Sequence, residues 1–337
     1  MNIDKPYTKK EVHPLFFASS EINLQNTKNS EALLSCFHEV KKERRGEKTS
    51  KQEIRPSIKT LQNEFIQDLL QTKGHLGTNN WTENMSKFLL GSRNGISIIN
   101  LEYTFICLRR VLQFLENMNR YYQVKMQGLE QLKSRSRFSS NFASSPHILF
   151  VNTHTKYSEL VKQAAIQSNQ SYINERWIGG TLTNWKQISE SILLYNKFST
   201  QFDSFLKLNN IQIPIYQKAK KRYEGLNYSR NDSPQSGRIQ EVKEAISVDF
   251  SDEKSLFSSS YIPDIIVLTN PDQNNIVIKE AQLFKIPIIA FADTNTKTLG
   301  IDYIIPGNNK SIYFMYFCLN LITITLQRNK LHREKKI

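Results

Sequence analysis

The sequence predicts an α/β domain in which a parallel sheet is covered by helices on both faces. Two short runs, Ile148 to Val151 and Ile265 to Leu268, are continuously apolar, as strands buried on both faces are. Each run is followed by a segment of helical length and then by another short strand. Strands that alternate with helices in this way form parallel sheets, because parallel neighbours need a long crossover connection. The length of 337 residues leaves room for one large domain or two ordinary ones.

The first 60 residues show no sustained periodicity and contain a dense charge run at 41–48. We expect residues 1–60 to form a basic, partly disordered N-terminal extension. Residues 61–185 are expected to form the first part of the α/β domain. This part should begin with a helix over 61–73, which ends at the glycines of 74–77. A polar loop should follow as far as Gly95, and 96–101 should be a short strand or an extended lead into a helix.

A long helix is predicted over 101–126, because apolar residues recur there at alternating spacings of four and three. Residues 131–145 are basic and rich in serine, which predicts a flexible linker. The helical seam could pack within the chain or on a neighbouring protein, and the sequence leaves both open. The seam consists of Leu101, Phe105, Leu108, Leu112, Leu115 and Tyr122, with Asn119 among them.

The remaining elements follow the same alternation. The first strand–helix–strand unit begins at Ile148, with a helix over 157–168 and a short strand at 172–173. Residues 186–260 are predicted to be a helical protrusion with a polar, Ser/Asn-rich insertion, and 329–337 a basic tail. The second part of the α/β domain spans 261–328, with strands at 265–268, 286–291 and 303–305 and helices at 274–285 and 309–328.

The charge is strongly basic and unevenly distributed. The chain carries 45 Lys and Arg against 31 Asp and Glu, a formal net charge of +14. Taken together, the two predicted core segments, 146–185 and 261–326, carry equal numbers of basic and acidic side chains. For any single basic cluster, solvated charge is as good an explanation as phosphate binding, but an excess confined to the appendages of a neutral core favours binding to phosphate. No uncharged apolar run reaches the roughly 18 residues that a membrane helix needs.

Known catalytic and metal-binding motifs are absent from the sequence. It has no Gly-rich nucleotide loop, no nucleophile elbow and no HExxH, and its three Cys and six His have no ligand spacing. Asp264, Asp272, Asp293 and Asp302 lie near strand ends, where we favour turn and cap roles over catalysis. The alternative function is a nucleotide-binding α/β enzyme, which would need a phosphate loop after Val151. Residues 152–156 contain no glycine and make a poor cradle.

The most specific stretch runs from Arg176 to Trp185, with the sequence RWIGGTLTNW. Adjacent glycines allow a tight turn, an arginine can bind phosphate, and two tryptophans offer flat faces. An RNA-contacting loop, a nucleotide-phosphate loop, and a loop folded onto its own core with both tryptophans buried all fit these residues.

This stretch closely resembles the signature of the bacterial-type ribosomal protein S2 family. Further blocks follow in the order of that family and bring the resemblance to about 66–185 and 261–328. They are Gly74-His75-Leu76-Gly77 with Trp81, Asn84, Met85 and Phe88, then Gly91 to Gly95, Ile98 to Leu101, Ile262-Pro263-Asp264, Lys279-Glu280-Ala281, Ile286-Pro287, Asp293-Thr294-Asn295 and Ile305 to Asn308.

The resemblance implies a flavodoxin-like three-layer α/β/α domain with a protruding helical hairpin. It implies a structural role without catalysis, cofactor or metal, in which the chain binds small-subunit rRNA and neighbouring ribosomal proteins and acts on no small-molecule substrate. The family usually has a second histidine where this chain has Thr78, which weakens a role of the turn in metal binding or tight packing. The unmatched expansions, rich in Asn, Ile and Lys, suggest an organellar ribosome, and we expect a mitochondrial rather than a plastid one.

The candidate site residues fall into two groups. We expect Arg176, Arg93, Lys87 and Lys156 to contact rRNA phosphates, and we add Thr183 and Asn184 to the binding set as residues that also fix the loop. Trp177 is expected to be half-buried support rather than a stacking platform. The residues expected to shape the loops are Gly179, Gly180, Trp177, Trp185, Gly74, His75 and Gly77.

Overall fold

The computed structural model describes residues 58–133, 145–192, 194, 195, 199, 213–227 and 262–334. The chain divides into two units, Met1–Phe65 and Ile66–Ile337, and the first unit is described only over 58–65. Those residues begin helix α2 (Ile58–Gln71), at the position of the predicted helix. The expected N-terminal extension before residue 58, most of the linker and the polar insertion at 228–261 lie outside the described residues.

The second unit is built on a five-stranded, all-parallel sheet, as predicted. Its strand order is β4-β3-β5-β6-β7, the order of flavodoxin-like doubly wound sheets. The expected strands are confirmed, with shifts of one or two residues at some ends. They are β3 (Ile148–Val151), β4 (Ser171–Ile173), β5 (Ile265–Leu268), β6 (Ile288–Ala292) and β7 (Tyr303–Pro306).

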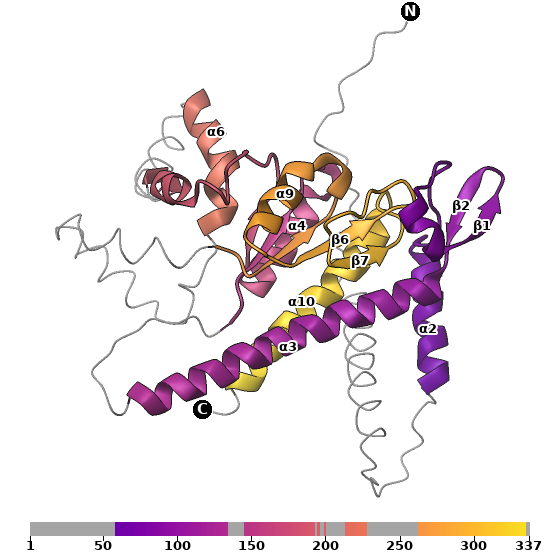
Figure 1. Cartoon of the computed structure of the whole chain (residues 1–337), viewed down its shortest axis with the longest axis horizontal. Helices are drawn as coiled ribbons and strands as arrows, with labels where there is room; N and C mark the ends of the chain where they lie inside the picture. The colour runs from indigo at the N-terminus through magenta and orange to yellow at the C-terminus, as the bar shows by residue number, and fades with distance from the viewer. Residues whose placement is uncertain are drawn as a thin grey trace, which may run out of the picture. The chain divides into compact units, whose positions relative to one another are not determined.

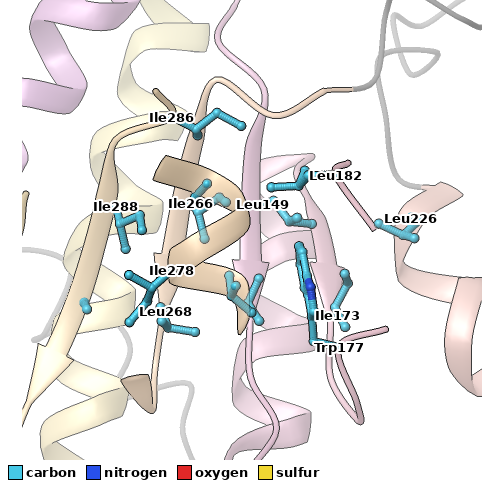
Figure 2. Packing of buried hydrophobic residues seen from close by; sticks show 14 of the residues in the cluster. Leu149, Ile173, Trp177, Leu182, Leu226, Ile266, Leu268, Ile278, Ile286 and Ile288 are labelled. Atoms are coloured by element: carbon cyan, nitrogen blue, oxygen red, sulfur yellow. The ribbon is translucent and has the colours of Figure 1, made fainter. Parts of the chain in front are cut away.

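The sheet is buried on both faces, which explains its continuous apolar strands. Alternate residues of a strand point to opposite faces. Leu149 pairs with Ile266, which pairs with Ile288, and all three belong to the apolar cluster under helix α9 (Asn275–Leu283). Figure 2 shows these side chains between the strands and that helix.

Three helices form the layer on the other face of the sheet. Helix α10 (Ile312–Glu334) packs against α4 (Ser158–Ser168) and against the long helix α3 (Leu101–Lys133), which also contacts β7 (Figure 1). The three-layer α/β/α architecture is therefore confirmed. The predicted seam of α3 faces this interior, and Leu108, Leu112 and Leu115 are fully buried within the chain. None of the helices described is long and apolar enough to cross a membrane.

Two helices run further than the sequence predicted. Helix α3 was expected to end at 126 and continues to Lys133, into the start of the expected linker. Gln, Leu, Glu and Lys are good helix formers and outweigh the single Gly128. Helix α10 was expected to end at 328 and continues to Glu334, because residues 312–334 contain neither Pro nor Gly.

The expected polar loop before Gly95 is instead a short helix and a hairpin. The 3₁₀ helix η2 (Glu83–Phe88) leads into β1 (Leu89–Arg93), which pairs antiparallel with β2 (Ile96–Ile99). Asn94 and Gly95 have φ values of 53° and 78°, the positive values that a type I′ turn requires. The Asn-Gly dipeptide was the sequence signal for this hairpin.

The expected protrusion is described in two helical pieces. Residues 185–192 are helical, and α6 (Pro214–Tyr223) continues into the 3₁₀ helix η4 (Glu224–Asn227). The Tyr195 ring stacks on the Tyr216 ring with a centroid distance of 6.0 Å, which brings the two pieces side by side.

Candidate functional site

The conspicuous loop at 176–185 is held by one buried carboxylate. Glu280 of α9 is only 6% exposed. Its Oε1 accepts hydrogen bonds from Trp177 Nε1 at 3.1 Å and from the Gly180 amide at 2.7 Å. Its Oε2 accepts one from the Leu182 amide at 2.9 Å. A carboxylate out of water needs such partners, and these three tie the loop to α9.

Both tryptophans of the loop are buried, so the loop is folded onto its own core. Trp177 and Trp185 are 6% and 8% exposed and belong to the apolar cluster under α9, and Figure 2 shows Trp177 in that cluster. Trp177 is therefore fully buried support rather than half-buried, and its ring is closed to a base. Gly180 has a φ of 89°, a left-handed conformation that favours glycine.

The polar residues of this loop mostly serve its geometry. Thr181 is buried, and its hydroxyl donates to the Ile178 carbonyl at 2.6 Å. Asn184 is exposed, and its side-chain amide donates to Gln187 Oε1 at 2.7 Å at the start of the following helix. Thr183 is exposed as well. The placement of Asn184 is consistent with a role in fixing the loop.

The turn at 74–77 is closely packed even without a second histidine. A Cβ on Gly74 would lie 2.7 Å from Phe314 Cδ2, and one on Gly77 would lie 2.3 Å from Thr294 Cγ2. The His75 carbonyl accepts from the Ile99 amide at 2.8 Å. Thr78, at the position where the family usually has histidine, donates its amide to Thr294 Oγ1 at 2.9 Å. In the described part of the chain, no group of three His, Cys, Asp or Glu could hold a metal ion.

All four residues expected to contact phosphate are exposed. Arg176 follows β4, and Lys156 lies in the 3₁₀ helix η3 (Thr155–Tyr157) after β3. Both therefore lie at the carboxyl edge of the sheet. Lys87 lies in η2 and Arg93 is the last residue of β1. A hydrogen bond of 2.8 Å from the Thr82 amide to the Thr294 carbonyl joins the start of this segment to the loop after β6. Figure 1 shows the β1–β2 hairpin on the β6–β7 side of the sheet, so these residues surround one edge rather than form one cluster.

The carboxyl edge between β3 and β5, where flavodoxin-like folds bind ligands, is closed by its own side chains. Thr153 Oγ1 accepts from the side-chain amides of Asn270 at 2.8 Å and Asn274 at 3.0 Å. The Thr269 hydroxyl donates to Asn152 Oδ1 at 2.9 Å. These polar groups bond to each other, and the edge offers no glycine cradle. The nucleotide-binding alternative is not supported.

Three of the four aspartates near strand ends join segments that are distant in the sequence, whereas a local turn contact is found at Asp293, whose Oδ1 accepts from the next residue. Asp264 Oδ2 accepts from the His147 amide at 2.7 Å, and Asp302 Oδ2 accepts from the Ile288 amide at 2.9 Å. Asp272 Oδ2 accepts from the Thr296 hydroxyl at 3.0 Å. Each carboxylate closes a connection between strands and loops.

Asp293 is the one buried aspartate of this group. Its Oδ1 accepts from the Thr294 amide at 2.7 Å. Burial raises the pKa of the Asp293 carboxyl above its usual value, while the hydrogen bond from Thr294 and the positive charge of Lys310 oppose the shift. Burial, followed by the charge of Asp293, raises the pKa of Tyr157 to about 12.

Sequence reasoning missed a basic group beside Arg176. The last turn of α6 carries Lys220, Lys221 and Arg222. The Lys221 ammonium lies 3.4 Å from Glu175 Oε1, next to Arg176 in the chain. The run KAKKR at 218–222 was the available signal, but only the fold brings it to the end of β4.

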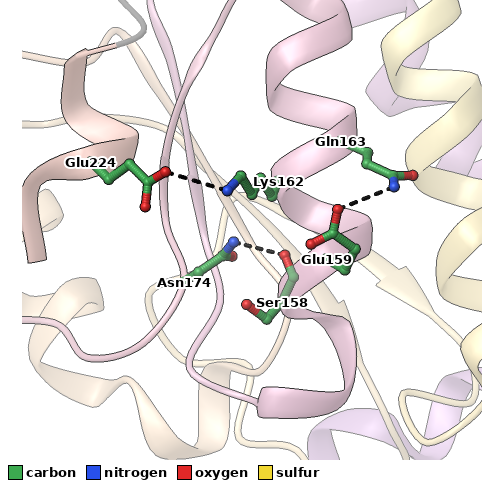
Figure 3. Close-up of polar contacts among 6 residues, drawn as sticks. All are labelled: Ser158, Glu159, Lys162, Gln163, Asn174 and Glu224. Carbon is green, nitrogen blue, oxygen red and sulfur yellow. Dashed lines mark hydrogen bonds and ion pairs between the residues drawn. The ribbon is translucent and has the colours of Figure 1, made fainter. Parts of the chain in front are cut away.

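Two further contacts tie this region to the domain, and Figure 3 shows both. The Lys162 ammonium of α4 lies 3.4 Å from Glu224 Oε1 of η4. The Asn174 side-chain amide donates to the Ser158 carbonyl at 2.7 Å. Ion pairs that are this exposed contribute little stability. The apolar contacts of this region come from Tyr223 at the end of α6 and from the buried Leu226 of η4, which pack on the apolar cluster under α9.

Fold and site together define a flavodoxin-like α/β protein with exposed cations on the loops and short elements around the carboxyl edge of its sheet. The family model described as ribosomal protein S2 matches residues 69–124 and 125–328. The match covers more than half of the sequence, and the chain belongs to the ribosomal protein S2 family.

Individual relatives agree with the family match. Small ribosomal subunit protein uS2m of Marchantia polymorpha is 31% identical over 278 residues, which cover 81% of this chain and 94% of the relative. Small ribosomal subunit protein uS2 of Marinobacter nauticus is 32% identical over 249 residues, covering 73% of this chain and 81% of the relative. The uS2 protein of Hahella chejuensis is 32% identical over 251 residues, covering 73% and 80%.

Proposed function

We propose that this protein is a structural constituent of the mitochondrial small ribosomal subunit. It binds small-subunit rRNA and neighbouring ribosomal proteins, and it catalyses no reaction. Family membership supports the ribosomal role. The similarity to a protein named uS2m supports the mitochondrial ribosome, although bacterial uS2 proteins are about equally similar.

The observation that carries this proposal is the placement of the exposed cations. Arg176, Lys156, Lys87 and Arg93 all lie on loops or short elements around the carboxyl edge of the sheet. The five strands of the parallel sheet carry no charged side chain. This arrangement leaves the cations able to reach phosphates without disturbing the fold.

The chemistry of binding follows from polyelectrolyte physics. Each Lys or Arg that neutralises a phosphate releases condensed counterions, so affinity falls steeply as salt rises. Such contacts set position and orientation rather than read bases. Glu280, Trp177 and Gly180 hold the 176–185 loop rigidly, so Arg176 loses little conformational freedom on binding. Thr183 and Asn184, exposed in the same loop, are proposed to contact the RNA beside Arg176.

Co-sedimentation tests the proposal directly. A tagged form of the chain is expressed in cells, mitochondria are isolated, and a gentle lysate is separated on a sucrose gradient. We expect the protein to migrate with small-subunit rRNA, to be released by RNase, and to yield crosslinks to that RNA. Migration only at the top of the gradient, or with cytosolic subunits, would overturn the ribosomal or the mitochondrial part of the proposal respectively.

Arg176→Ala tests the proposed phosphate contacts, with Lys279→Ala as the matched control. Lys279 is an exposed cation on α9 and is not among the four residues expected to contact phosphate. We expect Arg176→Ala to lower binding to rRNA and to reduce the slope of log K against log salt by about 1, without changing thermal stability. Lys279→Ala should change neither quantity. Equal effects of the two variants would show that net charge, and not the position of Arg176, decides binding.

A further inference from the structure

Trp81 differs from the other two tryptophans because its side chain is exposed. It is 56% exposed, whereas Trp177 and Trp185 are below 10%. A single exposed apolar side chain is ordinary on a protein surface and indicates nothing alone. The backbone beside Trp81 and the polar depression on the same segment indicate more than its exposure does.

The backbone on both sides of Trp81 is held rigidly. The Thr82 amide donates to the Thr294 carbonyl at 2.8 Å, and the Thr82 hydroxyl donates to the Thr296 carbonyl at 2.9 Å. On the other side, the Thr294 hydroxyl donates to the Asn80 carbonyl at 3.0 Å. The loop after β6 therefore fixes the backbone of residues 80–82, which carries the Trp81 indole. A fixed backbone loses less conformational entropy when a ligand binds.

An open depression of about 440 Å³ is lined by Asn79 and Asn80, the two residues that precede Trp81, while the Trp81 side chain itself lies outside the lining. Asn79, Asn80 and Asn295 supply amides that both donate and accept, and Lys310 supplies an ammonium. No carboxylate lines this depression. Its full lining consists of Gly77, Thr78, Asn79, Asn80, Ile96, Asn295 and Lys310.

An exposed indole on the same short segment as two of the amides, together with a cation in the depression, offers the groups that bind a nucleotide. A base can stack on an indole whatever its identity, amides can bond base edges or ribose hydroxyls, and an ammonium attracts phosphate. A protein partner anchored on Trp81 would favour apolar surroundings, and Ile96 is the one apolar side chain in the lining. The chemistry therefore favours RNA over protein.

We propose that Trp81 is a stacking platform for an unpaired nucleotide of RNA, whose polar groups occupy the depression beside Lys310. The choice of RNA as the polymer rests on the proposed function. The site extends the binding surface beyond the phosphate contacts, because stacking requires a base that is not paired within a duplex.

Binding of the full chain to two RNAs tests this site. One is a single strand of about 12 nucleotides and the other a duplex of the same length, both measured by fluorescence anisotropy at fixed salt. We expect Trp81→Ala to weaken single-strand binding about 5- to 150-fold, which corresponds to the loss of one base–aromatic stack. Duplex binding should stay within about twofold of the parent chain, since phosphate contacts alone carry it.

Three further variants separate stacking from other effects. Trp81→Phe keeps a ring and should retain most of the single-strand affinity. Tyr121→Ala removes an aromatic side chain that is 59% exposed on α3 and should change nothing. Lys310→Ala should reduce the salt slope by about 1, whereas Trp81→Ala should leave that slope unchanged.

Several results would overturn the stacking proposal. The first is a Trp81→Ala variant that binds the single strand as tightly as the parent chain. The second is a Trp81→Phe variant that loses as much single-strand affinity as Trp81→Ala. The third is a Trp81→Ala variant that loses as much affinity for the duplex as for the single strand. If Trp81→Ala kept its RNA affinity but lost a ribosomal protein in the gradient, Trp81 would be a protein anchor instead. The proposed function fails separately, when the parent chain itself binds neither RNA and stays outside ribosomal particles.

Discussion

Replacing Glu280 tests whether one buried carboxylate holds the 176–185 loop. Glu280→Ala leaves the Trp177 indole N–H and the amides of Gly180 and Leu182 without their acceptor. A buried donor without a partner costs about 1–3 kcal/mol. Three donors at the lower end of this range give about 3 kcal/mol, which we take as the expected loss in the free energy of unfolding because the costs of groups that share one acceptor do not simply add. That is a large part of the roughly 5–15 kcal/mol of an ordinary domain.

Glu280→Gln refines the same test. A glutamine keeps one side-chain oxygen, which can still accept from Trp177 and Gly180, but it turns an NH₂ group toward the Leu182 amide. We expect an intermediate loss of about 1–3 kcal/mol. The control is Glu159→Ala on α4, because Glu159 is exposed and accepts only from the exposed Gln163, at 3.2 Å. This control should stay within about 0.5 kcal/mol of the parent.

Urea denaturation followed by far-UV circular dichroism measures these differences, and tryptophan emission reports on Trp177. Emission of the folded Glu280→Ala variant should shift to longer wavelength as Trp177 gains contact with water. The reasoning is refuted if Glu280→Ala unfolds within about 0.5 kcal/mol of the parent, or if Glu280→Gln is as damaging as the alanine variant.

Two other predictions concern the packing of the turn at 74–77 and the buried Asp293. Gly77→Ala should destabilise the fold by about 1–3 kcal/mol, because its Cβ would lie 2.3 Å from Thr294 Cγ2. The matched control is Gly179→Ala, since a Cβ at Gly179 would meet nothing within 4 Å. Equal midpoints of thermal unfolding for the two variants would contradict the packing argument. Burial raises the pKa of the Asp293 carboxyl, so the folded state binds the carboxyl proton more tightly than the unfolded chain does. The stabilisation from this protonated carboxyl is therefore complete below about pH 4 and is lost as pH rises through the pKa of the folded state. Asp293→Asn should remove that decline above about pH 4 in denaturation curves, and an unchanged pH profile would contradict the role of Asp293 in it.

The sheet could be predicted from the sequence because its signal is local. Ile148 to Val151 and Ile265 to Leu268 are apolar at every position, and only burial on both faces explains such a run. Helix ends were less certain, since α3 and α10 continue through residues that are good helix formers but carry no stop signal. The hairpin at 89–99 did carry a local signal, the Asn94-Gly95 turn.

The candidate site divides along the same line. The sequence marked the 176–185 loop as unusual and identified Arg176 as a cation able to reach phosphate. It could not decide whether the tryptophans were exposed, because a ring that stacks on a base and a ring that fills a core are the same residue. It also could not indicate that Trp81, rather than Trp177, would be the exposed one.

The helices and strands, the neutral core with basic appendages and the resemblance to a family can all be read from the chain before it folds. Those properties depend on neighbours in the chain or on composition. The role of Glu280 is visible only in the folded protein, because its three donors precede it by 103, 100 and 98 residues. A carboxylate becomes an anchor when folding removes it from water and brings donors to it, and no local pattern encodes that meeting.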